Sequence, residues 1–324
     1  MSAVTGTEDA IRRLAATAAG HRRLLLLVAV VIALGLPLVV STSLLYDLSV
    51  VFVYGLLAFA AIVPIGYAGQ LVLSQGAFFG IGAYTFVKLT TAGVPGVAAV
   101  LVAVVLTAAV AYVLGKPATR ASGIYLGIIT LAFNELFVIA LDLFPSFTGG
   151  STGLSSPRLF PSAFTAGLPT EVVYYYLLLV VYALVLVGVR RLLHAETGWA
   201  FLSIKEDRTV AESIGVDTSR YRLLSFTLSG AVCGLAGGLF APLTGYLSPT
   251  MFDLQTSINI ILAGLLGGLT LPAGGLLGGG VVVLVPRFLR AVSDLRLIVY
   301  GTLLILLLIY LPQGIGGWLR ERFG

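Results

Sequence analysis

Long uncharged apolar stretches dominate this chain, and Lys, Arg, Asp and Glu are confined to short segments between them. A helix needs about 20 apolar residues to cross the hydrocarbon core of a bilayer. The pattern predicts an all-α fold, a polytopic transmembrane helical bundle. The boundaries of its charge-free runs place about ten spans near residues 24–41, 48–66, 77–91, 97–114, 122–141, 173–189, 223–241, 256–269, 275–289 and 297–311.

One uncharged stretch, 48–87, is 40 residues long and therefore holds two spans. Pro64 and several glycines interrupt it, which predicts a broken or re-entrant segment near 66–76. A second glycine-rich run, 267–280, is interpreted as a tight turn between packed helices. The alternative, in which 254–286 forms one broken crossing and the chain has nine spans, stays open.

Composition supports lipid as the main solvent, because 58% of the residues are hydrophobic and only 10% are charged. A soluble domain carries about 25% charged residues. The net charge of +5 sits in short connecting segments, so the positive-inside rule explains it better than a nucleic-acid partner does. With the N-terminus inside, 14 of the 19 Lys and Arg residues fall on the inner side.

This orientation defines a domain organisation in the membrane. Residues 1–23 form a cytoplasmic N-terminal segment, 24–312 the transmembrane domain, and 313–324 a cytoplasmic C-terminal tail. The first apolar run is too long for a typical signal peptide and is interpreted as an uncleaved span. The protein is expected to be a multi-pass protein of a plasma membrane, with both termini in the cytoplasm.

Two long hydrophilic segments connect the spans. The outer segment, 142–172, is rich in Pro, Gly, Ser and Thr and is predicted to be irregular. The inner segment, 190–222, is the most charged part of the chain, and Ala200–Ile214 is predicted to form one helix that Gly215 ends. A solvated linker and a docking helix for a cytoplasmic partner are both compatible with this pattern.

Polar side chains inside predicted spans are the candidate substrate pathway. Such groups line a transport pathway, or they pack helices together, and both interpretations stay open. For Glu135 there is a further interpretation, in which its carboxylate is simply hydrated near the end of a helix. The candidates are Gln70, Ser74, Gln75, Thr130, Asn134, Glu135 and Asn259.

Recognisable catalytic chemistry is absent from the sequence. None of the three lysines closes a phosphate-binding loop, and no nucleophile elbow or zinc-protease motif occurs. His21 and His194 are far apart, so no metal-ligand cluster is evident. We expect a protein that is not an enzyme, with no catalytic residue, no metal and no cofactor of its own.

Six motifs occur in an order that resembles the membrane permease subunits of branched-chain amino-acid ABC importers of the LivM type. The resemblance extends over residues 45–312. The motifs are G-Y-A-G-Q-L-V-L-S-Q-G-A-F-F-G-I-G-A-Y (66–84), G-I-Y-L-G-I-I-T-L-A-F-N-E-L (123–136), T-G-G-S-T-G-L (148–154), I-K-E-D-R-T-V-A-E-S-I-G-V-D-T-S-R-Y-R-L-L-S-F (204–226), G-Y-L-S-P-T-M-F-D (245–253) and S-I-N-I-I-L-A-G-L-L-G-G-L (257–269).

The resemblance implies an importer with four kinds of component. These are this permease, a second, homologous and non-identical permease, two cytoplasmic ATPases that use ATP, and an extracytoplasmic substrate-binding protein. It also implies that the inner segment docks the ATPase. The docking residues would be Lys205, Glu206, Asp207, Arg208, Val210, Ala211, Glu212, Ile214 and Gly215.

One motif departs from the family pattern, and it bears on the substrate. The family commonly has Gly-His-Gly where this chain has Ser74-Gln75-Gly76. An importer of urea, amides or another small solute is therefore an alternative to branched-chain amino acids. A secondary transporter that couples protons through Glu135, and a membrane scaffold, are the hypotheses from other classes.

Overall fold

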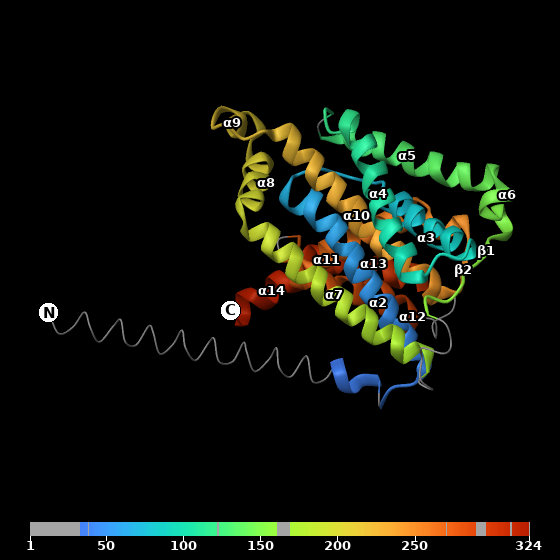
Figure 1. Ribbon diagram of the computed structural model, residues 1–324. Coiled ribbons are helices and arrows are strands. Elements are labelled where there is room, and N and C mark those ends of the chain that lie inside the picture. The colour runs from blue at the N-terminus through green and yellow to red at the C-terminus, as the bar shows by residue number, and fades with distance from the viewer. Residues whose placement is uncertain are drawn as a thin grey trace.

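A computed structural model describes residues 33–37, 39–121, 123–160, 169–269, 271–289, 296–311 and 313–323 (Figure 1). Nine longer helices form its body. They are α2 (Thr42–Ala61), α3 (Gln75–Thr91), α4 (Gly96–Ala118), α5 (Ile124–Leu143), α7 (Thr170–His194), α10 (Thr218–Thr244), α11 (Leu254–Gly267), α12 (Gly275–Phe288) and α13 (Arg296–Tyr310).

Short elements connect these helices. They are η1 (Ile62–Tyr67), α6 (Pro145–Thr148), η2 (Gly150–Thr152), β1 (Leu154–Ser155), α8 (Glu196–Glu206), α9 (Arg208–Ser213), β2 (Tyr246–Leu247), η4 (Pro249–Phe252), η5 (Pro272–Gly274) and α14 (Gly314–Phe323). The predicted polytopic helical bundle is confirmed.

Seven helices in the described ranges are long and apolar enough to cross a membrane. The helices α3 and α12, which match two further predicted spans, are shorter, with 17 and 14 residues. Most of the predicted first span, 24–41, lies outside the described residues. The count of ten spans therefore stays a prediction.

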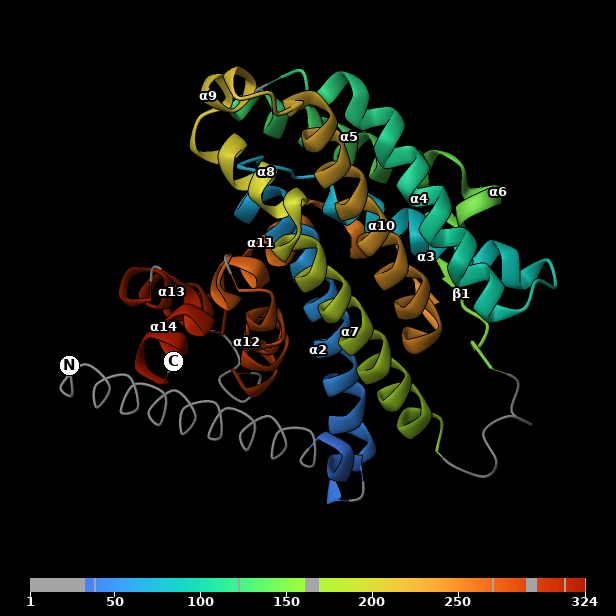
Figure 2. The same ribbon diagram turned by 60° about the vertical axis from the view of Figure 1, so that its left-hand side comes forward.

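The core forms where α3, α4 and α10 pack against one another, and where α2 packs against α7, α10, α11 and α12 (Figure 2). Small residues allow the closest of these approaches. A Cβ atom at Gly82 of α3 would overlap the carbonyl oxygen of Gly234 on α10. Because of this close contact, α3 is held deep inside the bundle rather than at its lipid-facing surface.

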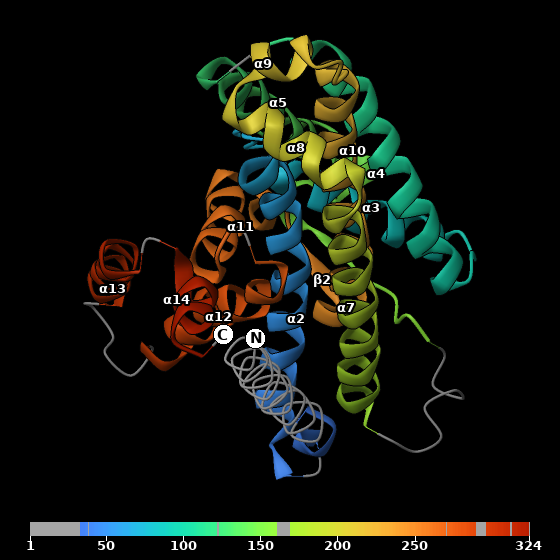
Figure 3. The same ribbon diagram turned by 90° about the vertical axis from the view of Figure 1, so that its left-hand side faces the viewer.

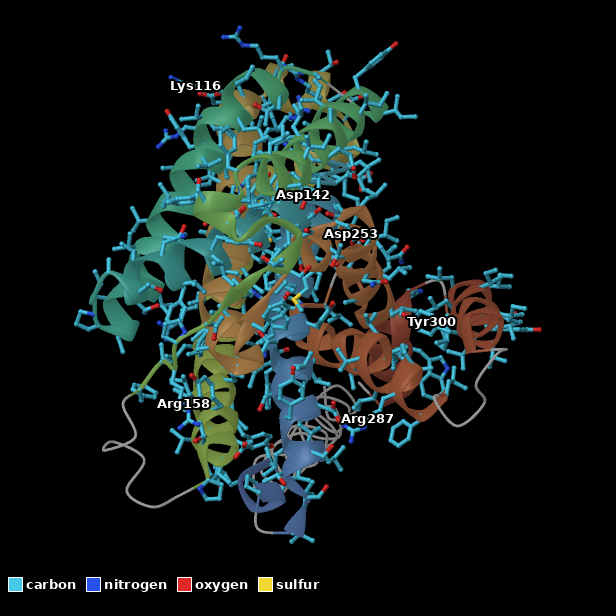
Figure 4. The ribbon with its side chains drawn as sticks, turned by 90° about the vertical axis from the view of Figure 1, so that its right-hand side faces the viewer. Lys116, Asp142, Arg158, Asp253, Arg287 and Tyr300 are labelled. Atoms are coloured by element: carbon cyan, nitrogen blue, oxygen red, sulfur yellow. The ribbon has the colours of Figure 1, made fainter. Side chains whose placement is uncertain are left out.

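Charged residues mark the two ends of the bundle. Lys116 lies at one end, and Arg158 and Arg287 lie towards the other (Figure 4). Arg287 at the end of α12 forms an ion pair with Asp47 near the start of α2, and its guanidinium also donates to the Ser43 carbonyl at 3.1 Å. This pairing explains how an arginine is accommodated at the predicted outer end.

The turn between α11 and α12 is tight, as predicted. The backbones of Gly267 and Gly274 come so close that a Cβ on either glycine would overlap the other residue. Two separate helices therefore occupy 254–288, and whether they make two crossings or one broken crossing stays a prediction.

The outer segment 142–172 is irregular in its described part, as predicted. It contains a four-residue helix, one 3-10 turn and a two-residue strand, and α7 already begins at Thr170. The strand β1 pairs antiparallel with β2, so that Leu154 lies opposite Leu247 and the segment is joined to the end of α10.

The prediction of one helix over Ala200–Ile214 is wrong, because Asp207 divides this segment into α8 and α9. The backbone of Asp207 is extended, with φ −156° and ψ 116°. Its carboxylate accepts the N–H groups of Thr209 and Val210 at 2.7 and 3.1 Å. An aspartate favours such a cap over a helix interior, which ends one helix and starts the next.

Candidate functional site

The helical structure is interrupted between α2 and α3, where the sequence predicts a broken segment. Pro64 lies in the π-helical turn η1, since proline lacks the N–H that a regular helix needs. Residues 69–74 then continue without regular structure, and α3 starts at Gln75. The Gln70 N–H donates back to the Pro64 carbonyl at 2.8 Å, which closes the turn.

Side chains from α5 and α11 bind the exposed backbone of this break. The N–H of Ala77 donates to Asn134 Oδ1 at 2.7 Å, and the N–H of Gly76 donates to Ser257 Oγ at 2.8 Å. The Ser257 hydroxyl in turn donates to Asn134 Oδ1 at 3.1 Å. Two side chains from other helices therefore cap the start of α3.

Thr130 acts in the same way one turn earlier on α5. Its Oγ1 accepts the Leu73 N–H at 3.0 Å and donates to the Leu126 carbonyl at 2.9 Å. Backbone groups inside a membrane protein must find partners within the protein or in water. Thr130 and Asn134 supply those partners, and both are fully buried.

Three further predicted residues, Gln70, Ser74 and Gln75, are also buried within the bundle. Gln70 Oε1 accepts the Ser225 hydroxyl of α10 at 3.2 Å. The Gln70 amide nitrogen, the Ser74 hydroxyl and both polar atoms of the Gln75 amide make no hydrogen bond to any described residue. The break thus holds buried polar atoms that water or a small polar solute could satisfy.

Glu135 and Asn259 are placed differently from these five residues. Both are partly exposed, Glu135 on α5 and Asn259 on α11. Asn259 Oδ1 accepts the Gln255 amide at 3.4 Å on the exposed side of α11. The structure therefore divides the seven predicted pathway residues into a buried set at the break and a partly exposed pair.

The inner segment lies against the break. Lys205 at the end of α8 donates from Nζ to the Gly66 carbonyl at 2.9 Å. A Cβ at Gly69 would also contact the Lys205 side chain, at 3.2 Å from its Cγ. The predicted docking segment therefore contacts the broken helix through Lys205.

The remaining predicted docking residues are mostly on the surface. Arg208 pairs with Glu212 at 2.9 Å, and Glu206 and Asp207 are exposed. Hydrogen bonds from Thr218 and then from Arg208 hold the pKa of the Glu212 carboxyl below its ordinary value. These bonds fix α9 to the start of α10.

Exposed apolar side chains stand out on the same segment. Val210 is 58% exposed and Ile214 is 70% exposed, whereas Ala211 is buried inside the segment. Gly215 has φ of 88° and ends α9, as predicted. Sequence analysis missed Trp199, which is 72% exposed. Its signal was available, because Trp199 is a large aromatic residue within the charged inner segment, outside every predicted span.

Sequence analysis also missed Ser225 and Ser257. Nothing in their local pattern distinguishes them from the small residues that pack helices, because their partners are far away in sequence. Metal ligands do not gather in the described residues, where His, Cys, Asp and Glu form no group of three or more that could hold an ion.

The chain matches the family model described as branched-chain amino acid transport system / permease component over residues 43–308. It is 31% identical to the high-affinity branched-chain amino acid transport system permease protein LivM of Salmonella typhimurium, over 91% of this chain and 75% of that protein. It is 24% identical to the LivH permease protein of the corresponding Escherichia coli system, over 82% of this chain and 91% of that protein.

A further relative differs in the cargo that its name gives. The autoinducer 2 import system permease protein LsrC of an Enterobacter species is 27% identical over 49% of this chain and 50% of that protein. No solved structure matches the chain.

Proposed function

Because this chain belongs to the branched-chain amino acid transport system permease family, we propose that it is the membrane permease subunit of an ABC importer. It forms a translocation pathway for branched-chain or related amino acids in a prokaryotic plasma membrane. The family match over most of the chain carries this proposal, and the contact between the inner segment and the broken helix supports it.

The proposed importer needs further subunits. A second permease, homologous and non-identical, completes the pathway. Two cytoplasmic ATPases bind and hydrolyse ATP, so this chain holds no cofactor, and an extracytoplasmic binding protein delivers the substrate. The relatives named LivM and LivH are two different permease proteins of one kind of transport system, which supports a non-identical partner.

The ATPase docks on the exposed apolar side chains of the inner segment. Trp199, Val210 and Ile214 are each more than half exposed, and charged residues surround them. Apolar side chains exposed outside the membrane mark a site of protein interaction. A short amphipathic helix that inserts its apolar side chains into a groove is a common mode of recognition.

Lys205 transmits the movement of the ATPases to the pathway. Closure of the ATPases on ATP displaces α8 and α9, and the bond from Lys205 to the Gly66 carbonyl carries this displacement into the break. A change between inward- and outward-facing states requires a ligand that binds the two states differently. ATP bound to the partner subunits supplies that bias.

Substitution of the apolar docking residues tests this proposal. Ile214→Asp in a tagged chain is expected to abolish co-purification of the ATPase, because a carboxylate would be buried in an apolar groove. Val97→Asp is the matched control, since Val97 is 55% exposed at the opposite end of the bundle. Equal recovery of ATPase with both variants would contradict the docking proposal.

The substrate class has an alternative. The match to an autoinducer 2 permease indicates that relatives of this chain differ in cargo, and Ser74-Gln75-Gly76 departs from the common family motif. Urea, amides or another small solute are the alternative substrates. The ligand of the cognate binding protein, measured by calorimetry, decides between them.

A further inference from the structure

An apolar groove lies between α4 and α5, two helices that are long and apolar enough to cross a membrane. Its volume of about 360 Å³ is within the usual range of ligand sites, about 300–1,000 Å³. All of the lining side chains are apolar, so hydrocarbon suits the groove better than a polar solute does. The lining residues are Ala109, Val110, Val113, Leu114 and Phe133.

The groove lies within one half of the bilayer. Leu114 and Ala109 precede Ala118, the last residue of α4, by four and nine residues. At a rise of about 1.5 Å per residue, the groove extends from about 6 to about 14 Å from this end of α4. Half of the hydrocarbon core is about 15 Å thick. The groove is therefore at the depth of the acyl chains of one leaflet, the inner leaflet in the predicted orientation.

Two basic residues follow the groove along α4. Ala109, Val113 and Lys116 recur at spacings of four and three residues, so they share one face of the helix. Lys116 and Arg120 are both exposed, and neither forms an ion pair with a described residue. The Lys116 ammonium group lies 5.5 Å from the centre of the Tyr112 ring, a contact that leaves its charge without a counter-ion.

A third positive charge approaches the same end of α4 from α10. A Cβ at Gly115 would contact the Leu223 side chain, so the end of α4 lies beside the start of α10. Figure 3 shows the turn between α4 and α5 at the same end of the bundle as α9 and the start of α10. Arg222 is only 5% exposed, and its Nη2 donates to the carbonyl of Ala121, the residue after Arg120, at 2.6 Å. Like the other two cations, it pairs with no described carboxylate.

A phosphate group joined to hydrocarbon chains matches both features of this surface. The three cations favour an anion, and the groove beside them accommodates an acyl chain. Basic pockets between membrane helices on the cytoplasmic side bind anionic lipid headgroups. Tyr125, in the first turn of α5, is 69% exposed at the same end, and tyrosine is enriched at the membrane–water interface.

We propose that an anionic phospholipid binds at this site, with its phosphate held by Lys116 and Arg120 and one acyl chain in the α4–α5 groove. Arg222 fixes the turn that carries Arg120 and adds its charge from behind. The site goes beyond the proposed function, since its ligand is a membrane lipid and not the transported solute.

A phosphatidylglycerol that carries a diazirine in one acyl chain is the probe for this site. It is added to the complete transporter, purified in detergent with its co-expressed subunits. After irradiation, mass spectrometry should find adducts on the peptides that contain residues 109–114 or Phe133. Unlabelled phosphatidylglycerol should displace the probe, whereas equal concentrations of phosphatidylcholine or inorganic phosphate should not. Displacement by phosphate would assign the cations to a free anion, and equal displacement by phosphatidylcholine would remove the role of charge; either result would overturn the proposal.

Removal of the two exposed cations tests their part in binding. The double variant Lys116→Gln, Arg120→Gln should bind the probe at this site at least roughly tenfold more weakly, because each basic residue at a membrane surface strengthens the attraction to anionic lipid. The matched control is Arg190→Gln, Arg191→Gln, which removes two exposed cations at the inner end of α7. Equal weakening by both double variants would show a general attraction of the charged surface and no defined site.

A bulky residue in the groove tests the acyl-chain position without a change of charge. Ala109→Trp should remove most of the adducts on the Phe133 peptide, whereas Val105→Trp should keep them, since Val105 is 69% exposed and lies outside the groove. Unchanged adducts with Ala109→Trp would contradict the position. Benzoylphenylalanine at Ala109 that links to another subunit, and not to lipid, would show that protein covers the groove.

These results are independent of the transport proposal. A complex that imports its substrate but gives none of the predicted adducts disproves only the lipid site. A complex that gives the adducts but imports no solute disproves the proposed function and leaves the lipid site standing.

Discussion

Asn134 stabilises the start of α3 from a different helix. Its Oδ1 accepts two hydrogen bonds, one from the Ala77 N–H and one from the Ser257 hydroxyl. Side chains that bind the backbone at a helix start normally come from the residue that precedes it. Here the preceding residue, Ser74, makes no cap bond, so the two distant side chains replace it.

Removal of the Asn134 amide should therefore destabilise the protein. Asn134→Ala leaves the Ala77 N–H buried without a partner, which costs about 1–3 kcal/mol in the free energy of unfolding. Asn259→Ala is the matched control, since Asn259 is partly exposed and its bond to Gln255 lies on the surface; its effect is expected to stay within about 0.5 kcal/mol. Thermal unfolding of the purified complex in detergent measures both, and equal losses would contradict the capping role.

Polarity at these positions could be predicted from the sequence, but burial could not. Thr130, Asn134 and Glu135 are close together in one span, yet the first two face the core and the third does not. Helical spacing assigns relative directions to side chains, and without contacts it gives no absolute direction. The partners Ser225 and Ser257 are more than 100 residues away from the residues they bind.

At the scale of elements, the inner segment packs directly against the chain that leads into the break. The helix α8 packs against η1 and α10, and Lys205 joins it to the chain just before the break. The sequence predicted both features separately. It contained no signal for their contact, because the two residues joined are 139 positions apart.

Lys205 offers a test of this coupling. Lys205→Met keeps the length of the side chain and removes its charged donor, so substrate uptake is expected to fall severalfold while the ATPase still co-purifies. Lys205→Arg keeps a donor and should restore much of the uptake. Transport and co-purification are measured on the same preparations.

The coupling role would be contradicted in either of two ways. Lys205→Met could lose the ATPase altogether, which would make Lys205 a docking residue only. Alternatively, uptake could stay at the level of the unmodified chain, which would mean that the bond to the Gly66 carbonyl carries no movement.

Several helices begin directly after an aspartate whose carboxylate accepts backbone N–H groups of the first turn. Asp207, Asp217 and Asp253 each cap a helix, with N–H to carboxylate distances of 2.7–3.1 Å. Asp207 was missed as a boundary, because the apolar spacing on both sides of it continued as in one helix. Local capping then prevailed over periodicity.

At the scale of the whole molecule, hydropathy predicted the class of fold but not its interior. Lipid is as apolar as leucine, so an apolar sequence does not by itself indicate whether a helix is buried, as α3 is, or peripheral, as α4 is. Small residues are the better signal of the interior, as Gly82 and Gly234 show at the contact of α3 with α10.

The orientation of the molecule follows from the same charges that mark its ends. We expect α8 and α9 to face the cytoplasm and Arg158 to face outward. In spheroplasts, a membrane-impermeant maleimide should label Arg158→Cys directly, and Thr209→Cys only after the membrane is opened. Both positions are exposed, and the reverse order of labelling would contradict the orientation.

ATP-dependent uptake by the reconstituted importer tests the central claim most directly. Proteoliposomes that hold this chain, its partner permease and the ATPases, supplied with the loaded binding protein, should accumulate a branched-chain amino acid when ATP is enclosed. Uptake should continue when a protonophore collapses the proton gradient. Uptake that ignores ATP and stops with the proton gradient would instead establish a secondary transporter that uses Glu135, and would contradict the account.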